Sequence, residues 1–374
     1  MGEKYFFNKI DWALIAFVLP ILGAGLLTMN SFSGDSSYFT RQIYWIIFSL
    51  IIFVVFSFID FSFLKKTNIL VFLFLAFSGL LAILFFLGQI SHGAQSWFDL
   101  GGFSFQPSDV MKLVLILVLS KYFSRRHIEI ANIKHIIISG LYTLVPFVLV
   151  LLQPDFGSAM IIFLIWFGMA LVSGISKRHL FLVFGIGVLA ISILWVSVFQ
   201  MYQKERIINF LNPLTDIHGS GYNAYQSTIA VGSGKLLGKD VGFGTQSRLQ
   251  FLPEYETDFV FSAFAEEWGF VGSLFILLLF SFVIWKVLLI SIVGATNFEI
   301  LFGLGVAIFF SSHIIINIGM NIGILPVTGI TLPFMSYGGS HLVTEFAALG
   351  ILSSMKRYSR AAHRDEMKNE FLGI

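Results

Sequence analysis

The chain alternates long apolar stretches with short polar segments along nearly all of its 374 residues. A bilayer core needs about 20 residues of helix to cross it, and several stretches approach that length without a charged residue. The pattern predicts an all-α membrane protein with ten transmembrane helices. The expected spans lie at 12–29, 43–59, 69–87, 110–123, 136–152, 156–175, 180–201, 259–285, 300–325 and 342–356.

Two of these spans carry a charge in an otherwise apolar helix. The fourth is short and contains Lys112, and the tenth contains Glu345. A charged side chain at the bilayer centre costs about 2.5–3.5 kcal/mol on insertion scales. We therefore expect both helices to lie inside the bundle, away from lipid.

Lysine and arginine placement predicts the orientation. With ten spans, 16 of the 23 basic residues fall on the side of the termini, and six fall on the other side. Cytoplasmic loops are the ones enriched in Lys and Arg, so both termini should be cytoplasmic. We expect one transmembrane domain over residues 1–374, with the segments 88–109, 202–258 and 326–341 on the outer face.

Composition supports the membrane assignment. The chain is 57% hydrophobic and 12% charged, with a mean hydropathy of +0.87, whereas soluble domains have about 25% charged residues. A net charge of +2 gives no electrostatic reason to expect a nucleic-acid partner. The absence of cysteine excludes thiol and disulfide chemistry.

The segment 202–258, between the seventh and eighth spans, is the longest connection, at 57 residues. Loops of this length are uncommon unless they are functional. Its end leads into the eighth span through a run of carboxylates that includes Glu254 and Asp258. Asp258 precedes an apolar run and should lie at a helix start, where the helix dipole favours an anion. The residues alone leave two roles open, a helix cap at Thr257 or Asp258 and a general base.

A second polar stretch leads into the fourth span. Pro107 and Ser108 predict a helix start with Ser108 as the N-cap. Asp109 and Lys112 are three residues apart and should pair on one helix face. A pair that merely neutralises itself is the favoured interpretation, and an anion site at Lys112 is the alternative. Asp155, after Gln153, is predicted to cap the sixth span.

The third outer segment, 326–341, is rich in Pro and Gly and is predicted to dip back into the bundle. Irregular backbone at that depth needs a covering of protein or a water-filled cavity. His313, Asn317 and Asn321 recur every four residues on one face of the ninth span, a spacing that favours interhelical hydrogen bonds. No set of side chains has metal-ligand spacing.

Several ordered segments resemble a known family. They are GAQSW at 93–97, FQPSDVMKL at 105–113, QPDFGSA at 153–159, RIINFLNP at 206–213, GYNAYQSTIAVGSG at 221–234, GTQSRLQFLPEYETDF at 244–259, AEEWGFVG at 265–272 and LPFMSYGGS at 332–340. Together they resemble the SEDS family of peptidoglycan glycosyltransferases, and more its RodA branch than its FtsW branch. The resemblance spans nearly the whole chain.

The resemblance implies an enzyme of the bacterial cytoplasmic membrane that polymerises lipid II into β-1,4 glycan strands at the outer face, for cell elongation and shape. The family's catalytic aspartate falls on Asp258. Its PSE-x-x-K pattern falls on residues 107–112, with Asp109 in place of Glu. We expect a substrate site of Lys112, Asp109, Arg206, Gln153, Lys239, Arg248, Glu254 and Ser340.

The implied reaction is one inverting displacement. Asp258 would take the proton of the acceptor hydroxyl, and basic residues, with Mg²⁺ or Mn²⁺ as an optional helper, would stabilise the departing diphosphate. Implied partners are the nascent glycan, a class B penicillin-binding protein and other membrane proteins of the elongation complex.

Two positions depart from the family pattern. Ser96 stands where Arg is usual, which removes one candidate phosphate ligand, and Asp240 stands where a glycine is usual. Two other functions suit the ten-span pattern: a lipid II flippase, and a non-catalytic scaffold for the crosslinking enzyme. A flippase needs a polar path to the cytoplasmic side, whereas the embedded polar residues gather in the outer half.

Overall fold

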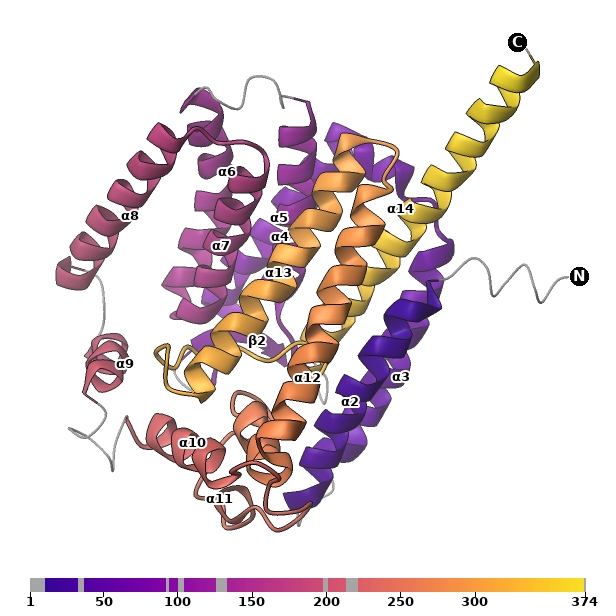
Figure 1. The fold of residues 1–374 in the computed structure, drawn as a ribbon. Helices are drawn as coiled ribbons and strands as arrows, with labels where there is room; N and C mark the ends of the chain where they lie inside the picture. The colour runs from indigo at the N-terminus through magenta and orange to yellow at the C-terminus, as the bar shows by residue number, and fades with distance from the viewer. Residues whose placement is uncertain are drawn as a thin grey trace, which may run out of the picture.

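The computed structural model describes residues 11–32, 37–91, 94–99, 104–125, 133–197, 201–212 and 221–372. The long helices are α2 (Trp12–Phe32), α3 (Ser37–Phe58), α4 (Thr67–Leu87), α5 (Pro107–Ser124), α6 (Ile133–Leu152), α7 (Phe156–Val172), α8 (Lys177–Ser197), α12 (Val260–Ile292), α13 (Asn297–Asn321) and α14 (Gly339–Leu372). They form an elongated bundle from which the end of α14 projects (Figure 1).

Each expected span overlaps one of these long helices, often with shifted ends. Six of the described helices are long and apolar enough to cross a membrane: α2, α3, α4, α6, α12 and α13. The chain is thus a multi-pass membrane protein, and the count of ten spans stays a prediction. The tenth span extends furthest beyond its expected end, because α14 continues to Leu372.

Helices α5 and α13 lie at the centre of the bundle. Helix α13 packs against α5, α7 and α12, and α14 packs against α3 and α5. Lys112 on α5 is 2% exposed and Glu345 on α14 is fully buried. The expectation that both charged spans lie inside the bundle is confirmed.

The segments 88–109 and 202–258 contain regular structure that the sequence did not predict. Residues 88–109 include three short antiparallel strands, β1 (Gln89–Ser91), β2 (Ala94–Asp99) and β3 (Ser104–Phe105), so the chain is mostly helical rather than all-α. The 202–258 segment contains α9 (Met201–Leu211), α10 (Tyr222–Ser233) and α11 (Thr245–Arg248). Helices α10 and α11 lie at the end of the bundle where α12 begins (Figure 1).

Helix α12 is interrupted near its start. Gly269 has φ 66° and ψ −164°, which is not helical, and the next two backbone amides bond instead to the carbonyls of Lys235 and Leu236, at 2.9 and 3.1 Å. Cβ atoms cannot fit where the two segments meet, since one at Gly238 would lie 1.9 Å from the Glu267 carbonyl oxygen. The 234–250 segment is thereby fixed against the break in α12.

The 326–338 segment dips into the bundle as predicted. It is irregular from Leu325 to Gly338, yet Leu332, Phe334 and Met335 are almost completely buried. Glycines on two neighbouring helices leave room for this segment. A Cβ at Gly25 of α2 would lie 2.2 Å from the carbonyl oxygen of Met335, and a Cβ at Gly157 of α7 would lie 2.6 Å from the carbonyl oxygen of Thr328. Protein covers this non-helical backbone on two sides.

Ion pairs join the helices at the end of the bundle opposite to the start of α12. The carboxylate of Asp11, just before α2, contacts Lys356 of α14 and lies 3.2 Å from Lys286 of α12. Lys65 follows α3 in the short 3-10 helix η1 (Phe61–Lys65) and lies 2.7 Å from Glu299 of α13.

Candidate active site in the bundle

Asp258 lies at the end of the turns that lead into α12. The first residue of the helix is Val260 and the N-cap is Phe259, without a side-chain cap bond. Of the two roles that the sequence left open, a helix cap at Thr257 or Asp258 is therefore excluded. The Thr257 hydroxyl instead donates to the Glu254 carboxylate at 2.9 Å. Asp258 is partly exposed.

Two asparagines of α13 fix the backbone at Asp258. The side-chain amides of Asn317 and Asn321 donate to the Asp258 carbonyl at 2.9 and 3.0 Å. Asn321 also accepts from the backbone amide of Ser262 at 3.0 Å. Both asparagines are completely buried. The predicted hydrogen-bonding role of this α13 face is confirmed, and its target is the aspartate segment.

The 326–338 segment closes around the same turn. The Ser336 hydroxyl donates to the Thr257 carbonyl at 2.6 Å, and the Tyr337 amide donates to the Glu256 carbonyl at 2.7 Å. Gly329, at φ 72°, lies beside the carboxylate, and a Cβ added there would lie 3.6 Å from Asp258 Oδ2. Backbone contacts thus hold Asp258 between α13 and this segment.

A buried ion pair on α5 is the second candidate cluster. Lys112 Nζ lies 3.1 Å from Asp109 Oδ1, and both side chains are 3% exposed. The predicted pairing is confirmed. Asp109 Oδ2 has no hydrogen-bond partner among the described residues, so the pair does not satisfy all of its own polar atoms.

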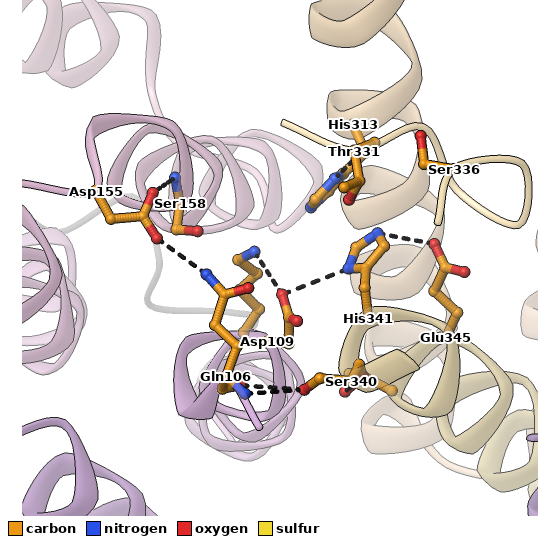
Figure 2. A network of polar contacts seen from close by, with 12 residues as sticks. Gln106, Asp109, Asp155, Ser158, His313, Thr331, Ser336, Ser340, His341 and Glu345 are labelled. Carbon is orange, nitrogen blue, oxygen red and sulfur yellow. Dashed lines mark hydrogen bonds and ion pairs between the residues drawn. The ribbon is translucent and has the colours of Figure 1, made fainter. Parts of the chain in front are cut away.

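The pair extends into a larger network from α14 and α13. His341 Nδ1 lies 3.4 Å from Asp109 Oδ1, and His341 Nε2 lies 2.9 Å from Glu345 Oε1. The ring of His313 lies against that of His341 at 4.7 Å between centroids. Figure 2 shows the imidazole of His341 between the two carboxylates. Sequence reasoning did not single out His341, although its spacing of four from Glu345 places both on one helix face.

Polar side chains at the starts of α5, α7 and α14 lie beside this network. Ser340 Oγ accepts from the Gln106 amide at 3.2 Å, and the Gln106 side chain donates to Asp155 at 3.1 Å (Figure 2). Asp155 caps α7 as predicted, accepting from the Ser158 amide at 2.9 Å. The expected cap at Ser108 is wrong, because α5 begins at Pro107 with Gln106 as its N-cap.

The other predicted substrate residues have separate surroundings. Gln153 is buried and donates to the Leu81 carbonyl at 2.6 Å. Lys239 lies 2.8 Å from the completely buried Glu266. Arg248 is exposed on α11, and Arg206 is half-buried on α9. The structure therefore brings together Asp109, Lys112 and Ser340 around one network, and the Glu254 carboxylate contacts Thr257, the residue before Asp258.

Burial changes the acidity of groups near Asp258. It raises the pKa of the Glu256 carboxyl, which the neighbouring Glu254 raises further, while a hydrogen bond from Tyr255 opposes the shift. Burial and the Glu256 carboxylate also raise the pKa of the Tyr255 hydroxyl. Burial and negative charge in this turn thus favour the protonated forms of Glu256 and Tyr255.

The two departures from the family pattern lie in different surroundings. Ser96 on β2 is 1% exposed, and its hydroxyl has no hydrogen-bond partner among the described residues. Asp240 is exposed and has φ 69°, a backbone conformation that explains why a glycine is usual there. The described residues contain no group of three His, Cys, Asp or Glu side chains that fits a metal ion.

Comparison with known proteins gives the same family over most of the chain. The FtsW/RodA/SpoVE family model, described as "Cell cycle protein", matches residues 5–361. The probable peptidoglycan glycosyltransferase FtsW of Wigglesworthia glossinidia brevipalpis is 37% identical over 363 residues, covering 93% of both chains. The peptidoglycan glycosyltransferase MrdB of Escherichia coli K12 is 35% identical, over 96% of this chain and 97% of its own.

Solved structures agree. A chain from a peptidoglycan synthase complex, in which polymerization and crosslinking are coordinated, is 30% identical with a TM-score of 0.80, over 94% of this chain and 98% of its own. The rod shape determining protein RodA of Thermus thermophilus is 28% identical with a TM-score of 0.70, over 93% of this chain and 97% of its own. On sequence and fold together, the chain belongs to the FtsW/RodA/SpoVE family of cell cycle proteins.

Proposed function

We propose that the protein is a peptidoglycan glycosyltransferase that polymerises lipid II into β-1,4 glycan at the outer face of the bacterial cytoplasmic membrane. The observation that carries the proposal is the fixed position of Asp258, whose carbonyl accepts from both Asn317 and Asn321. A general base has to be held in position by its surroundings. The names of the relatives support the reaction class.

The reaction is a single inverting displacement at the sugar carbon that bears the diphosphate. The acceptor hydroxyl oxygen forms the new bond, Asp258 takes its proton, and the diphosphate leaves with the electron pair of the broken bond. We assign the stabilisation of that anion to Lys112, whose ammonium group has one acceptor among the described residues. Diphosphate is a good leaving group, so one carboxylate suffices.

A divalent cation stays part of the proposal only as an accessory. The described residues offer no three-ligand set, and no step here depends on the ion. Stimulation by Mg²⁺ or Mn²⁺ after chelation would indicate that the ion binds together with the substrate diphosphate.

Asp258→Asn tests the assignment of the base. Asparagine keeps the shape but cannot take a proton at neutral pH, so polymerisation of fluorescent lipid II should fall by about 10²–10⁴-fold. Melting temperature should stay near wild type, because the bonds to Asn317 and Asn321 use the backbone. Asp240→Asn is the matched control, since Asp240 is exposed and its positive φ suits Asn. An Asp258→Asn protein that polymerises at the wild-type rate would sink the assignment.

We also propose a partner protein and a biological role. Similarity to a chain from a peptidoglycan synthase complex supports a crosslinking partner, which we propose is a class B penicillin-binding protein. We propose elongation and cell shape as the biological role. The relatives named FtsW and stage V sporulation protein E, at 37% and 33% identity, are about as similar to this chain as MrdB, at 35%. Co-purification with each candidate transpeptidase separates these roles.

We further propose that both termini and the α5–α6 connection face the cytoplasm, as the basic residues indicate. The chain has no cysteine, so a single cysteine at position 127 can be labelled with a membrane-impermeant maleimide. Labelling is expected only after the membrane is opened. Labelling from outside intact cells would reverse the orientation.

A further inference from the structure

A second carboxylate is buried next to the Asp109–Lys112 pair, on a different helix. Glu345 is completely buried, and Glu345 Oε2 accepts from the Phe334 amide at 3.0 Å. Phe334 has a positive φ of 61°, which a non-glycine residue adopts only where its surroundings hold it. Glu345 is therefore fixed in place as an acceptor.

His341 connects the two carboxylates. Its ring nitrogens face Asp109 Oδ1 at 3.4 Å and Glu345 Oε1 at 2.9 Å. Neither ring nitrogen has an aligned hydrogen bond among the described residues, so these two contacts act through the positive charge that an imidazolium brings. Two buried carboxylates and one ammonium would otherwise leave an uncompensated negative charge, which is costly. The geometry therefore favours a cationic His341.

His313 completes the surroundings of His341 without a charge of its own. Its Nδ1 lies 3.3 Å from the Thr331 carbonyl oxygen, and its Nε2 has no hydrogen-bond partner among the described residues. This pattern suits a neutral ring that donates through Nδ1. The titratable groups packed here are thus Asp109 and Lys112 of α5, His313 of α13, and His341 and Glu345 of α14.

Lys112 and His341 compete for one oxygen. Lys112 Nζ and His341 Nδ1 both approach Asp109 Oδ1, at 3.1 and 3.4 Å. An ammonium group has three donors, and the described residues give Lys112 Nζ one acceptor, Asp109 Oδ1. The negative charge of Asp109 is thus shared between two cations, and Lys112 keeps donors for another anion.

We propose that His341 is a positioning residue: by sharing Asp109 and balancing Glu345, it leaves the Lys112 ammonium available to the diphosphate of the lipid-linked substrate. The inference rests on the proposed function. Without His341, the site would carry two carboxylates against Lys112 alone, and the excess negative charge would repel a diphosphate. His341 thus acts through charge and contact with Asp109, away from the reacting atoms.

His341→Gln tests the proposal through the affinity of the purified full-length protein for inorganic pyrophosphate, measured by calorimetry. The Kd is expected to rise about tenfold, and the KM for lipid II should rise in parallel with little change in kcat, since a lost ground-state contact weakens uniform binding. His135→Gln is the matched control, because it replaces a buried histidine of α6 that contacts Tyr122, outside this network. Its Kd should stay within about twofold of wild type.

A charge rescue separates this role from a purely structural one. In the double variant His341→Gln/Asp109→Asn, Lys112 and Glu345 balance again, so the Kd should return to within about threefold of wild type. A Kd unchanged in His341→Gln would overturn the proposal, and so would a raised Kd that Asp109→Asn does not lower. The calorimetric readout needs no turnover, so failure of wild-type protein to polymerise lipid II would count against the proposed function alone.

Discussion

Two buried carboxylates, Glu266 and Asp109, have opposite hydrogen-bonding surroundings. Glu266 Oε1 accepts from five donors: Ser233 Oγ, Lys239 Nζ, Thr245 N and Oγ1, and Gln246 N, at 2.8–3.3 Å. Asp109 has Lys112 and His341 at one oxygen and no hydrogen-bond partner at the other among the described residues. A buried carboxylate with all its hydrogen bonds made holds a segment in place, whereas one with an unused oxygen can still accept a hydrogen bond from another group.

The difference separates two kinds of basic residue that look alike in the sequence. Lys239 and Lys112 are both lysines near candidate binding segments. Lys239 belongs to the network that fixes the 234–250 segment against α12, while Lys112 lies in the network with spare donors. We therefore assign diphosphate binding to Lys112 and a structural role to Lys239.

The largest expected effect is on stability, from Glu266→Ala. Removing the carboxylate leaves Lys239 and several backbone and hydroxyl donors without their acceptor. Breaking such a buried pair lowers the free energy of unfolding by about 3–5 kcal/mol. Thermal unfolding in detergent should show it, and proteolysis should cut the 234–250 segment sooner. Lys239→Met removes one donor of five and should cost much less. Equal losses from the two changes would break the comparison.

The next effect is on activity, from Lys112→Ala. Removing one positive donor from a diphosphate site should lower kcat/KM for lipid II by about 10²–10³-fold. Some stability should be lost too, because Asp109 keeps only His341. The double variant Asp109→Asn/Lys112→Met removes both charges. If it polymerises at the wild-type rate, the pair is structural, and Asp109 belongs with Glu266.

The smallest expected effect is on the melting temperature, from Glu256→Gln, and it adds a third carboxylate to the comparison of Glu266 with Asp109. Burial raises the pKa of Glu256, so the folded state binds its proton more tightly than the unfolded state. Its contribution to stability is complete below its unfolded pKa of about 4.3 and is lost as the pH rises through the folded value. Glu256→Gln should therefore melt higher than wild type near neutral pH, with the difference vanishing in acid. A constant difference across that range would exclude Glu256 as its source.

Local rules predicted part of this structure well. The Asp109–Lys112 pair and the Asp155 cap follow from spacing along one helix or across one turn, and both are confirmed. The caps at Ser108 and Asp258 failed because the chain entered α5 and α12 one or two residues away from the expected position. Helix ends depend on neighbouring segments as well as on local sequence.

Contacts between distant segments were beyond the sequence. Nothing near Glu266 indicates that its acceptors would be filled from residues 233–246, and the strands β1 to β3 depend on pairing across turns. His341 acquires its meaning only when α14 packs beside α5. Periodicity reveals which faces are apolar, but it does not determine which polar residues from different helices meet.

The Asp11 carboxylate also bears on how the protein is made. Its contact with Lys356 joins residues 345 positions apart, and α3 packs against α14 near the other end of the chain. During synthesis, α2 and α3 leave the ribosome well before α14 does. The surfaces at Asp11 and on α3 that contact Lys356 and α14 therefore stay uncovered until α14 has been synthesised. A nascent chain that stops before Lys356 would present those surfaces to the insertion and degradation machinery of the membrane, so quality control can recognise incomplete molecules by their first helices.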